Sequence, residues 1–156
     1  MPHRILNVPK DGMIEGFNAA LAARGIVADP AQLIAAMRLQ KFYDELLALK
    51  AARRGRLRKL LVRPELPRGV WFWGGVGRGK SFLMDCFFAA VPYQRKRRVH
   101  FHAFMREIHD SLRRHRNESD PLAKVAARIA RETRLMCFDE FHVSDIADAM
   151  MLGRLM

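Results

Sequence analysis

The chain has 156 residues, half of them hydrophobic, which is long enough for one domain with a substantial core. Its 28 basic and 16 acidic residues give a formal net charge of +12, which favours anionic partners such as nucleotides, nucleic acids or acidic protein surfaces. No apolar run reaches the roughly 18 residues of a membrane span, and Cys86 and Cys137 each lie inside an apolar run, so we expect no membrane span, buried reduced thiols and a cytoplasmic location.

The N-terminal part is predicted to hold a loose arm and one long helix. Residues 1–28 mix proline and glycine with a short apolar stretch, which indicates an arm with at most a short helix. Asp29 and Pro30 form a cap and first-turn signature. Apolar residues then recur at spacings of four and three, which predicts an amphipathic helix over about residues 30–52. They are Ala35, Leu39, Phe42, Leu46 and Leu49.

A phosphate-binding loop follows a basic connector that ends near residue 68. The apolar run Val70–Trp73 predicts a buried strand, and the apolar residues after Lys80 predict a helix. Between them, eight residues fit G-x-x-x-x-G-K-[ST] in the strand, loop, helix context that this motif requires. We expect the loop to bind a nucleotide, with Lys80 at the phosphates and Ser81 on Mg²⁺. The eight residues are Gly74, Gly75, Val76, Gly77, Arg78, Gly79, Lys80 and Ser81.

The middle of the chain predicts a second strand and two helices. The strand is expected at Val99–His102, after four consecutive basic residues. His100 and His102 would share a face of it, but no further ligand completes a convincing metal set nearby. Apolar spacing predicts helices over about 104–112 and 121–129.

An acid pair ends the next predicted strand. The four apolar residues Leu135–Phe138 lead into Asp139 and Glu140, as expected of a strand that delivers carboxylates to the carboxyl edge of a parallel sheet, where ligands bind. We expect Asp139 to hold Mg²⁺ directly or through water, and Glu140 to polarise the attacking water. A last apolar helix is expected to start at Ser144 or Asp145.

Four linked motifs resemble the family of ZapE cell-division ATPases and their mitochondrial AFG-type relatives, a branch of the AAA+ proteins. The motifs are WGGVGRGKS at 73–81, VHFHAFM at 99–105, CFDEF at 137–141 and VSDIADAM at 143–150. The resemblance implies a P-loop α/β fold with three α/β/α layers around a parallel sheet. It also implies Mg-dependent ATP hydrolysis, homo-oligomers of the full-length protein and, in bacterial members, action on the tubulin-like protein FtsZ.

The same resemblance implies that the chain is C-terminally truncated. Family members continue with a sensor strand, an arginine finger and a helical lid, none of which can be assigned here, and the sensor strand would lie between the strands ending at Trp73 and Asp139. We therefore predict three parts: an arm at 1–28, a helix and connector at 29–68, and an incomplete ATPase core at 69–156. Alternatives are a fragment that binds nucleotide with negligible hydrolysis, and a nucleic-acid-associated ATPase, which only the basic composition supports.

Overall fold

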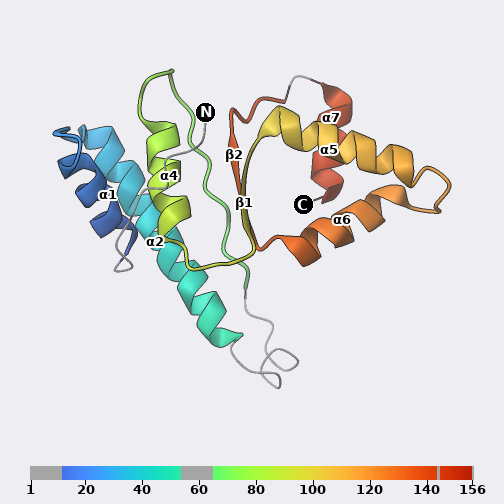
Figure 1. Cartoon of the computed structure of the whole chain (residues 1–156), viewed down its shortest axis with the longest axis horizontal. Helices are drawn as coiled ribbons and strands as arrows, with labels where there is room; N and C mark the ends of the chain where they lie inside the picture. The colour runs from blue at the N-terminus through green and yellow to red at the C-terminus, as the bar shows by residue number, and fades with distance from the viewer. Residues whose placement is uncertain (1–11, 54–64, 144, 156) are drawn as a thin grey trace. The chain divides into compact units, whose positions relative to one another are not determined.

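A computed structural model describes residues 12–53, 65–143 and 145–155 (Figure 1). These residues form two compact units that divide between Pro92 and Tyr93. No helix among the described residues has the length and apolar character to cross a bilayer. The structure is thus a mixed α/β fold, and its sheet is a small parallel one.

Three predictions fall on residues that the structure does not describe. The first part of the N-terminal arm (1–11) and most of the basic connector (54–64) lie outside the described residues, as does Ser144. The short helix that the arm could hold is present as α1 (Met13–Ala22), but the described part of the arm is not loose, because α1 buries Met13 and Phe17.

The first unit packs α1 and α2 (Pro30–Ala52) against α4 (Lys80–Ala90), the helix that follows the phosphate loop. Aromatic pairs join them: Phe42 of α2 stacks on Phe87 of α4 with ring centroids 5.4 Å apart, and Phe17 of α1 lies 5.8 Å from Phe82. Such pairs add to the burial of apolar surface. The two N-terminal helices therefore hold α4 in place within this unit.

The predicted helix over 30–52 is confirmed, and its start is strongly specified. The Asp29 side chain accepts a hydrogen bond of 2.8 Å from the Gln32 backbone, while Oε1 of Gln32 accepts one of 3.2 Å from the Asp29 backbone. This reciprocal arrangement is a capping box, and Pro30 occupies the first turn. Leu39, Phe42 and Leu46 of the predicted apolar stripe are buried.

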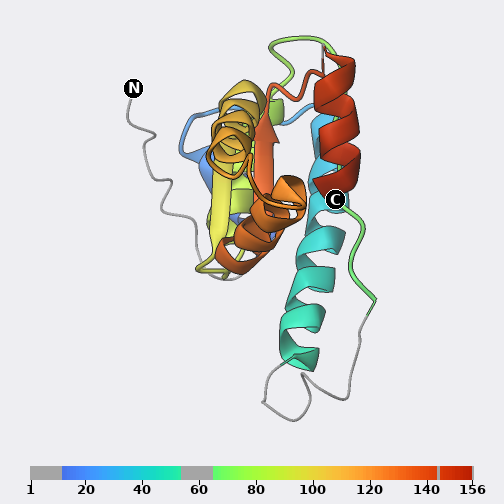
Figure 2. The ribbon, with the colours of Figure 1, turned by 90° about the vertical axis from the view of Figure 1, so that its right-hand side faces the viewer.

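The second unit is a parallel strand pair with helices around an aromatic core. Strands β1 (Lys96–His100) and β2 (Leu135–Asp139) pair in the register Lys96 to Leu135 and His100 to Asp139, and they run side by side in Figure 2. The helices are α5 (Phe101–Arg114), α6 (Pro121–Glu132) and α7 (Ile146–Leu155). The core consists of Phe101, Phe104, Met105, Ile108 and Val125, and partly buried residues of β2 and α7 pack against it.

The strand predicted at Val99–His102 is wrong in its position. The structure places β1 over the basic residues Lys96–His100, and α5 already begins at Phe101. Arg97 and Arg98 can enter a strand because each guanidinium pairs with a carboxylate, on Glu107 and Asp139 respectively. Period-two hydrophobic patterning does not predict this strand, since three of its four partly buried residues are charged.

The strand predicted at Val70–Trp73 is also wrong. Residues 65–75 have no regular secondary structure, and the side chains of Trp71 and Trp73 are largely exposed. Sheet pairing among the described residues is confined to β1 and β2. An extended apolar segment becomes a strand only when a neighbour takes up its backbone hydrogen bonds.

Both cysteines are buried free thiols, as predicted. Burial raises the pKa of Cys86 and of Cys137 to about 11. The thiolate is the reactive form, so neither side chain is suited to nucleophilic or redox chemistry near neutral pH.

Candidate functional site

The phosphate loop is an open turn that leads directly into α4. Gly77 and Gly79 have φ angles of 80° and 78°, in the left-handed region where glycine alone is unstrained, and Gly79 is the N-cap of α4. A Cβ built on Gly74, Gly75 or Gly77 would meet no heavy atom within 4 Å, so the surface of the loop is free to be approached closely. The first amides of α4 have no acceptor within the helix and add its positive dipole end, which suits an anion.

Lys80 lies over the same loop. Its ammonium donates hydrogen bonds of 2.8 Å to the Gly74 carbonyl and 2.6 Å to the Gly75 carbonyl. The motif therefore places a full positive charge against the loop to which the sequence analysis assigns the phosphates. Ser81 follows in the first turn of α4, with an exposed side chain.

Helix α2 contacts the second half of the loop, at Arg78. Nε2 of Gln32 donates a 3.2 Å hydrogen bond to the Arg78 carbonyl. The guanidinium of Arg78 lies 3.9 Å from a carboxylate oxygen of Asp29, and both side chains are exposed, so this ion pair is weak. Sequence reasoning found the Asp29 cap but missed the role of Gln32, because a contact across 46 positions leaves no local signal.

The acid pair lies at the carboxyl end of β2. Asp139 is 18% exposed and accepts a 2.8 Å hydrogen bond from Arg98 of the neighbouring strand. Glu140 is more open, and its Oε2 lies 3.9 Å from Nδ1 of His100. The φ angle of Glu140 is 51°, an uncommon backbone conformation for a residue with a side chain, and such strain is found preferentially at functional sites.

The predicted metal ligands are the Ser81 hydroxyl and the Asp139 carboxylate. Both are hard oxygen donors, so their chemistry fits Mg²⁺. They belong to different units, Ser81 to the first and Asp139 to the second. Within the described part of the chain, no group of three or more histidine, cysteine or acidic residues could hold a metal ion.

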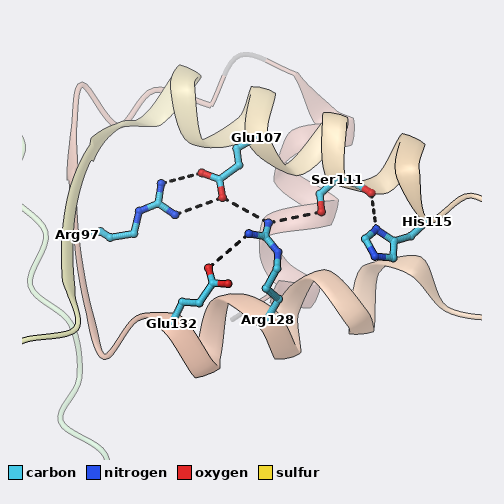
Figure 3. A network of polar contacts seen from close by, with 6 residues as sticks. All are labelled: Arg97, Glu107, Ser111, His115, Arg128 and Glu132. Carbon is cyan, nitrogen blue, oxygen red and sulfur yellow. Dashed lines mark hydrogen bonds and ion pairs between the residues drawn. The ribbon is translucent and has the colours of Figure 1, made fainter.

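A charged network holds β1, α5 and α6 together (Figure 3). Glu107 accepts two hydrogen bonds from Arg97, of 2.7 and 3.3 Å, and lies 3.4 Å from Arg128 of α6. Arg128 also reaches Glu132 at 3.4 Å and the buried Ser111 at 3.5 Å. Chiefly through the hydrogen bond from Arg97, the network holds the pKa of Glu107 below its ordinary value. The network holds β1 in place. Because β1 pairs with β2, it also supports the acid pair at the end of β2.

Three curated relatives match part of the chain. The cell division protein ZapE of Escherichia coli K12 is 54% identical over 89 residues, which are 57% of this chain and 24% of ZapE. Lactation elevated protein 1 homolog B of Danio rerio is 43% identical over 104 residues, 60% of this chain and 21% of that protein. An uncharacterised protein of Schizosaccharomyces pombe is 44% identical over 98 residues, 59% of this chain and 22% of that protein.

The matched region spans about a quarter or less of the length of these relatives. No solved structure matches the chain. The profile of the AFG1-like ATPases matches residues 13–156, which include the phosphate loop and the acid pair. On this match over nearly its whole length, the chain belongs to the AFG1-like ATPase family, whose members are P-loop NTPases.

Proposed function

We propose that this chain binds ATP at the loop Gly74–Ser81 and supports Mg-dependent hydrolysis through Glu140. The observation that carries the proposal is the position of Lys80, whose ammonium lies within 2.6–2.8 Å of two loop carbonyls. A group held over these acceptors can also donate to the β- and γ-phosphates. Membership of an ATPase family supports the same reading.

Each polar side chain then has a distinct role. The loop amides and Lys80 bind and orient the phosphates, and Glu140 positions a water for attack on the γ-phosphate. Ser81 and Asp139 would hold Mg²⁺, which supplies charge neutralisation for the phosphates when bound. The strained backbone of Glu140 supports this assignment, because a left-handed conformation costs about 1 kcal/mol or more without a structural benefit.

The wider role proposed for the protein follows from its family. We propose a cytoplasmic ATPase that acts in cell division on FtsZ and forms homo-oligomers in a longer form of the protein. The similarity to a cell division protein over 89 residues supports the cell-division role, whereas FtsZ, the oligomers and the location are proposed from the family resemblance alone. For the ATPase core at 69–156 we propose the P-loop architecture of three α/β/α layers around a parallel sheet. The N-terminal segments 1–28 and 29–68 are proposed as separate parts of the chain.

A second candidate is nucleotide binding with negligible hydrolysis. It is favoured by the pairing of Asp139 with Arg98, which occupies a carboxylate oxygen of the proposed magnesium ligand. Hydrolysis would also be slow if no residue of this chain acts as the arginine finger, because an arginine finger is worth about 10³ to 10⁵ in turnover. Phosphate release during ATP binding separates the two candidates.

Two substitutions test the proposed roles. Lys80→Ala is expected to weaken ATP binding, whereas Glu140→Gln should leave binding intact and remove turnover. Lys41→Ala, an exposed lysine on α2, is the matched control and should change neither quantity. Affinity is measured by calorimetry with and without Mg²⁺, and turnover by phosphate release. Equal loss of binding in the Lys80 and Glu140 variants would contradict the role assigned to Glu140.

A further inference from the structure

The phosphate loop has two arms that are held differently. Lys80 donates to the carbonyls of Gly74 and Gly75 and so spans the first arm. The second arm, Gly77–Gly79, contains two glycines in the left-handed region, which have the greatest conformational freedom of any residue. A loop of this kind must be held in one conformation if it is to present its amides to a ligand without an entropic penalty.

Gln32 of α2 supplies such a contact. Its carboxamide is used at both ends, because Oε1 accepts from the Asp29 backbone at 3.2 Å and Nε2 donates to the Arg78 carbonyl at 3.2 Å. The first bond fixes the orientation of the amide, so the second is aimed at the loop. A Cβ on Gly79 would lie only 2.8 Å from Nε2 of Gln32, which shows how closely α2 approaches this arm.

The anchor of this contact is rigid. The Gln32 backbone is held by Asp29 at 2.8 Å, and α2 is fixed to α4 through the stacked rings of Phe42 and Phe87. The helix that follows the loop and the helix that braces it are therefore one packed element. Arg78 adds little through its own side chain, since its pair with Asp29 is long and exposed.

We propose that Gln32 is a positioning residue for the phosphate loop: through the Arg78 carbonyl it holds the Gly77–Gly79 arm in its ligand-binding conformation and links the capping of α2 to phosphate affinity. This inference rests on the proposed function, because it takes the loop to be the ATP site. Gln32 lies outside the loop motif and has no predicted contact with ATP.

Two variants distinguish the hydrogen bond from Gln32 to the loop from two other effects, the loss of the capping bond to Asp29 and the addition of a charge. Gln32→Glu keeps the acceptor of the capping box, removes the donor to Arg78 and adds a negative charge. Gln32→Met has similar length, adds no charge and removes both hydrogen bonds. The property that they share is the loss of the Nε2 donor. We expect both to bind Mg·ATP about two- to tenfold more weakly than the wild type, the range of one hydrogen bond.

The readouts are ATP affinity by calorimetry, thermal stability by circular dichroism, and millisecond hydrogen exchange of the amides of residues 76–83. Both variants should exchange faster than wild type without nucleotide, and Gln32→Met alone should lose stability, because the Asp29 backbone N–H then lacks its acceptor in the capping box. Wild-type exchange in both variants, or a change confined to Gln32→Met, would overturn the inference. If the wild type binds no ATP, the proposed function fails, whereas hydrogen exchange still decides whether Gln32 holds the loop.

Discussion

Replacing Glu107 by Gln removes the central charge of the network in the second unit while keeping the size of the side chain. In the wild type this carboxylate accepts two hydrogen bonds from Arg97 and lies 3.4 Å from Arg128, so it joins β1 to α5 and α6 (Figure 3). The amide can accept through its single oxygen, but its NH₂ group would face a guanidinium donor. We expect the variant to fold with a lower free energy of unfolding.

The magnitude follows from the contacts and their exposure. A hydrogen bond to a charged group contributes about 1.5–3 kcal/mol when it is well buried. The side chains of Glu107, Arg97 and Arg128 are 29%, 34% and 31% exposed, so solvent screening reduces this value. We expect a loss of about 1–2 kcal/mol, which corresponds to a fall of roughly 0.5–1 M in the urea midpoint.

Glu132→Gln is the matched control. This residue makes a single 3.4 Å contact with the same Arg128, and its side chain is 55% exposed. Its loss should lower stability by less than about 0.5 kcal/mol, as for other exposed pairs one helical turn apart. Equal shifts in the urea midpoints of the two variants would refute the reasoning.

The pH dependence provides an independent check. Because the pKa of Glu107 is lowered in the folded protein, its stabilisation is complete above the pKa of an unfolded glutamate. It is lost as the pH falls through the folded value. The difference between wild type and Glu107→Gln should therefore be largest near neutral pH and should shrink at acid pH, below about 4. A difference that stays constant down to acid pH would contradict the assigned cause.

Two further predictions concern the same unit. Ile108→Ala removes a fully buried side chain from the core cluster and should lower the free energy of unfolding by about 2–5 kcal/mol in urea titrations, whereas a loss below about 1 kcal/mol would show a poorly packed core. Asp120→Ala removes the side chain that caps α6 at the Ala123 amide and should lower stability by about 1 kcal/mol, with a small loss of helical circular dichroism. Unchanged stability in this variant would mean that the cap contributes nothing.

Much of the helical structure could be predicted from local sequence. The caps Asp29 and Asp120 and the apolar spacing after them depend on neighbours a few positions away, so α2 and α6 were found close to their true bounds. The apolar run before Asp139 likewise identified β2. Local propensity and periodicity were sufficient wherever the decisive contacts lie within one turn or one strand.

The strands that failed depend on distant partners. Lys96–Arg98 looks like a solvated basic run, and only its pairing with Glu107 and Asp139 explains why these residues form β1. Val70–Trp73 has the apolar character of a buried strand, but that character cannot supply the neighbouring backbone that a strand requires.

The candidate site divides in the same way. The order of glycines, lysine and serine predicts a phosphate-binding loop, and the proposal that it binds ATP draws on the left-handed glycines and the hydrogen bonds of Lys80. The contact from Gln32 and the pairing of Arg98 with Asp139 join residues 46 and 41 positions apart, which a single sequence does not reveal. The first contact holds the loop, and the second holds a carboxylate of the acid pair.

The most direct test of this account is ATP binding to the purified chain by calorimetry, with and without Mg²⁺, beside the Lys80→Ala variant. We expect saturable binding that Mg²⁺ strengthens and that Lys80→Ala weakens, because the ammonium beside the loop would pair with phosphate. A wild-type chain that is folded by circular dichroism but binds no ATP, or binds it equally well without Lys80, would contradict the assignment of this loop as the nucleotide site.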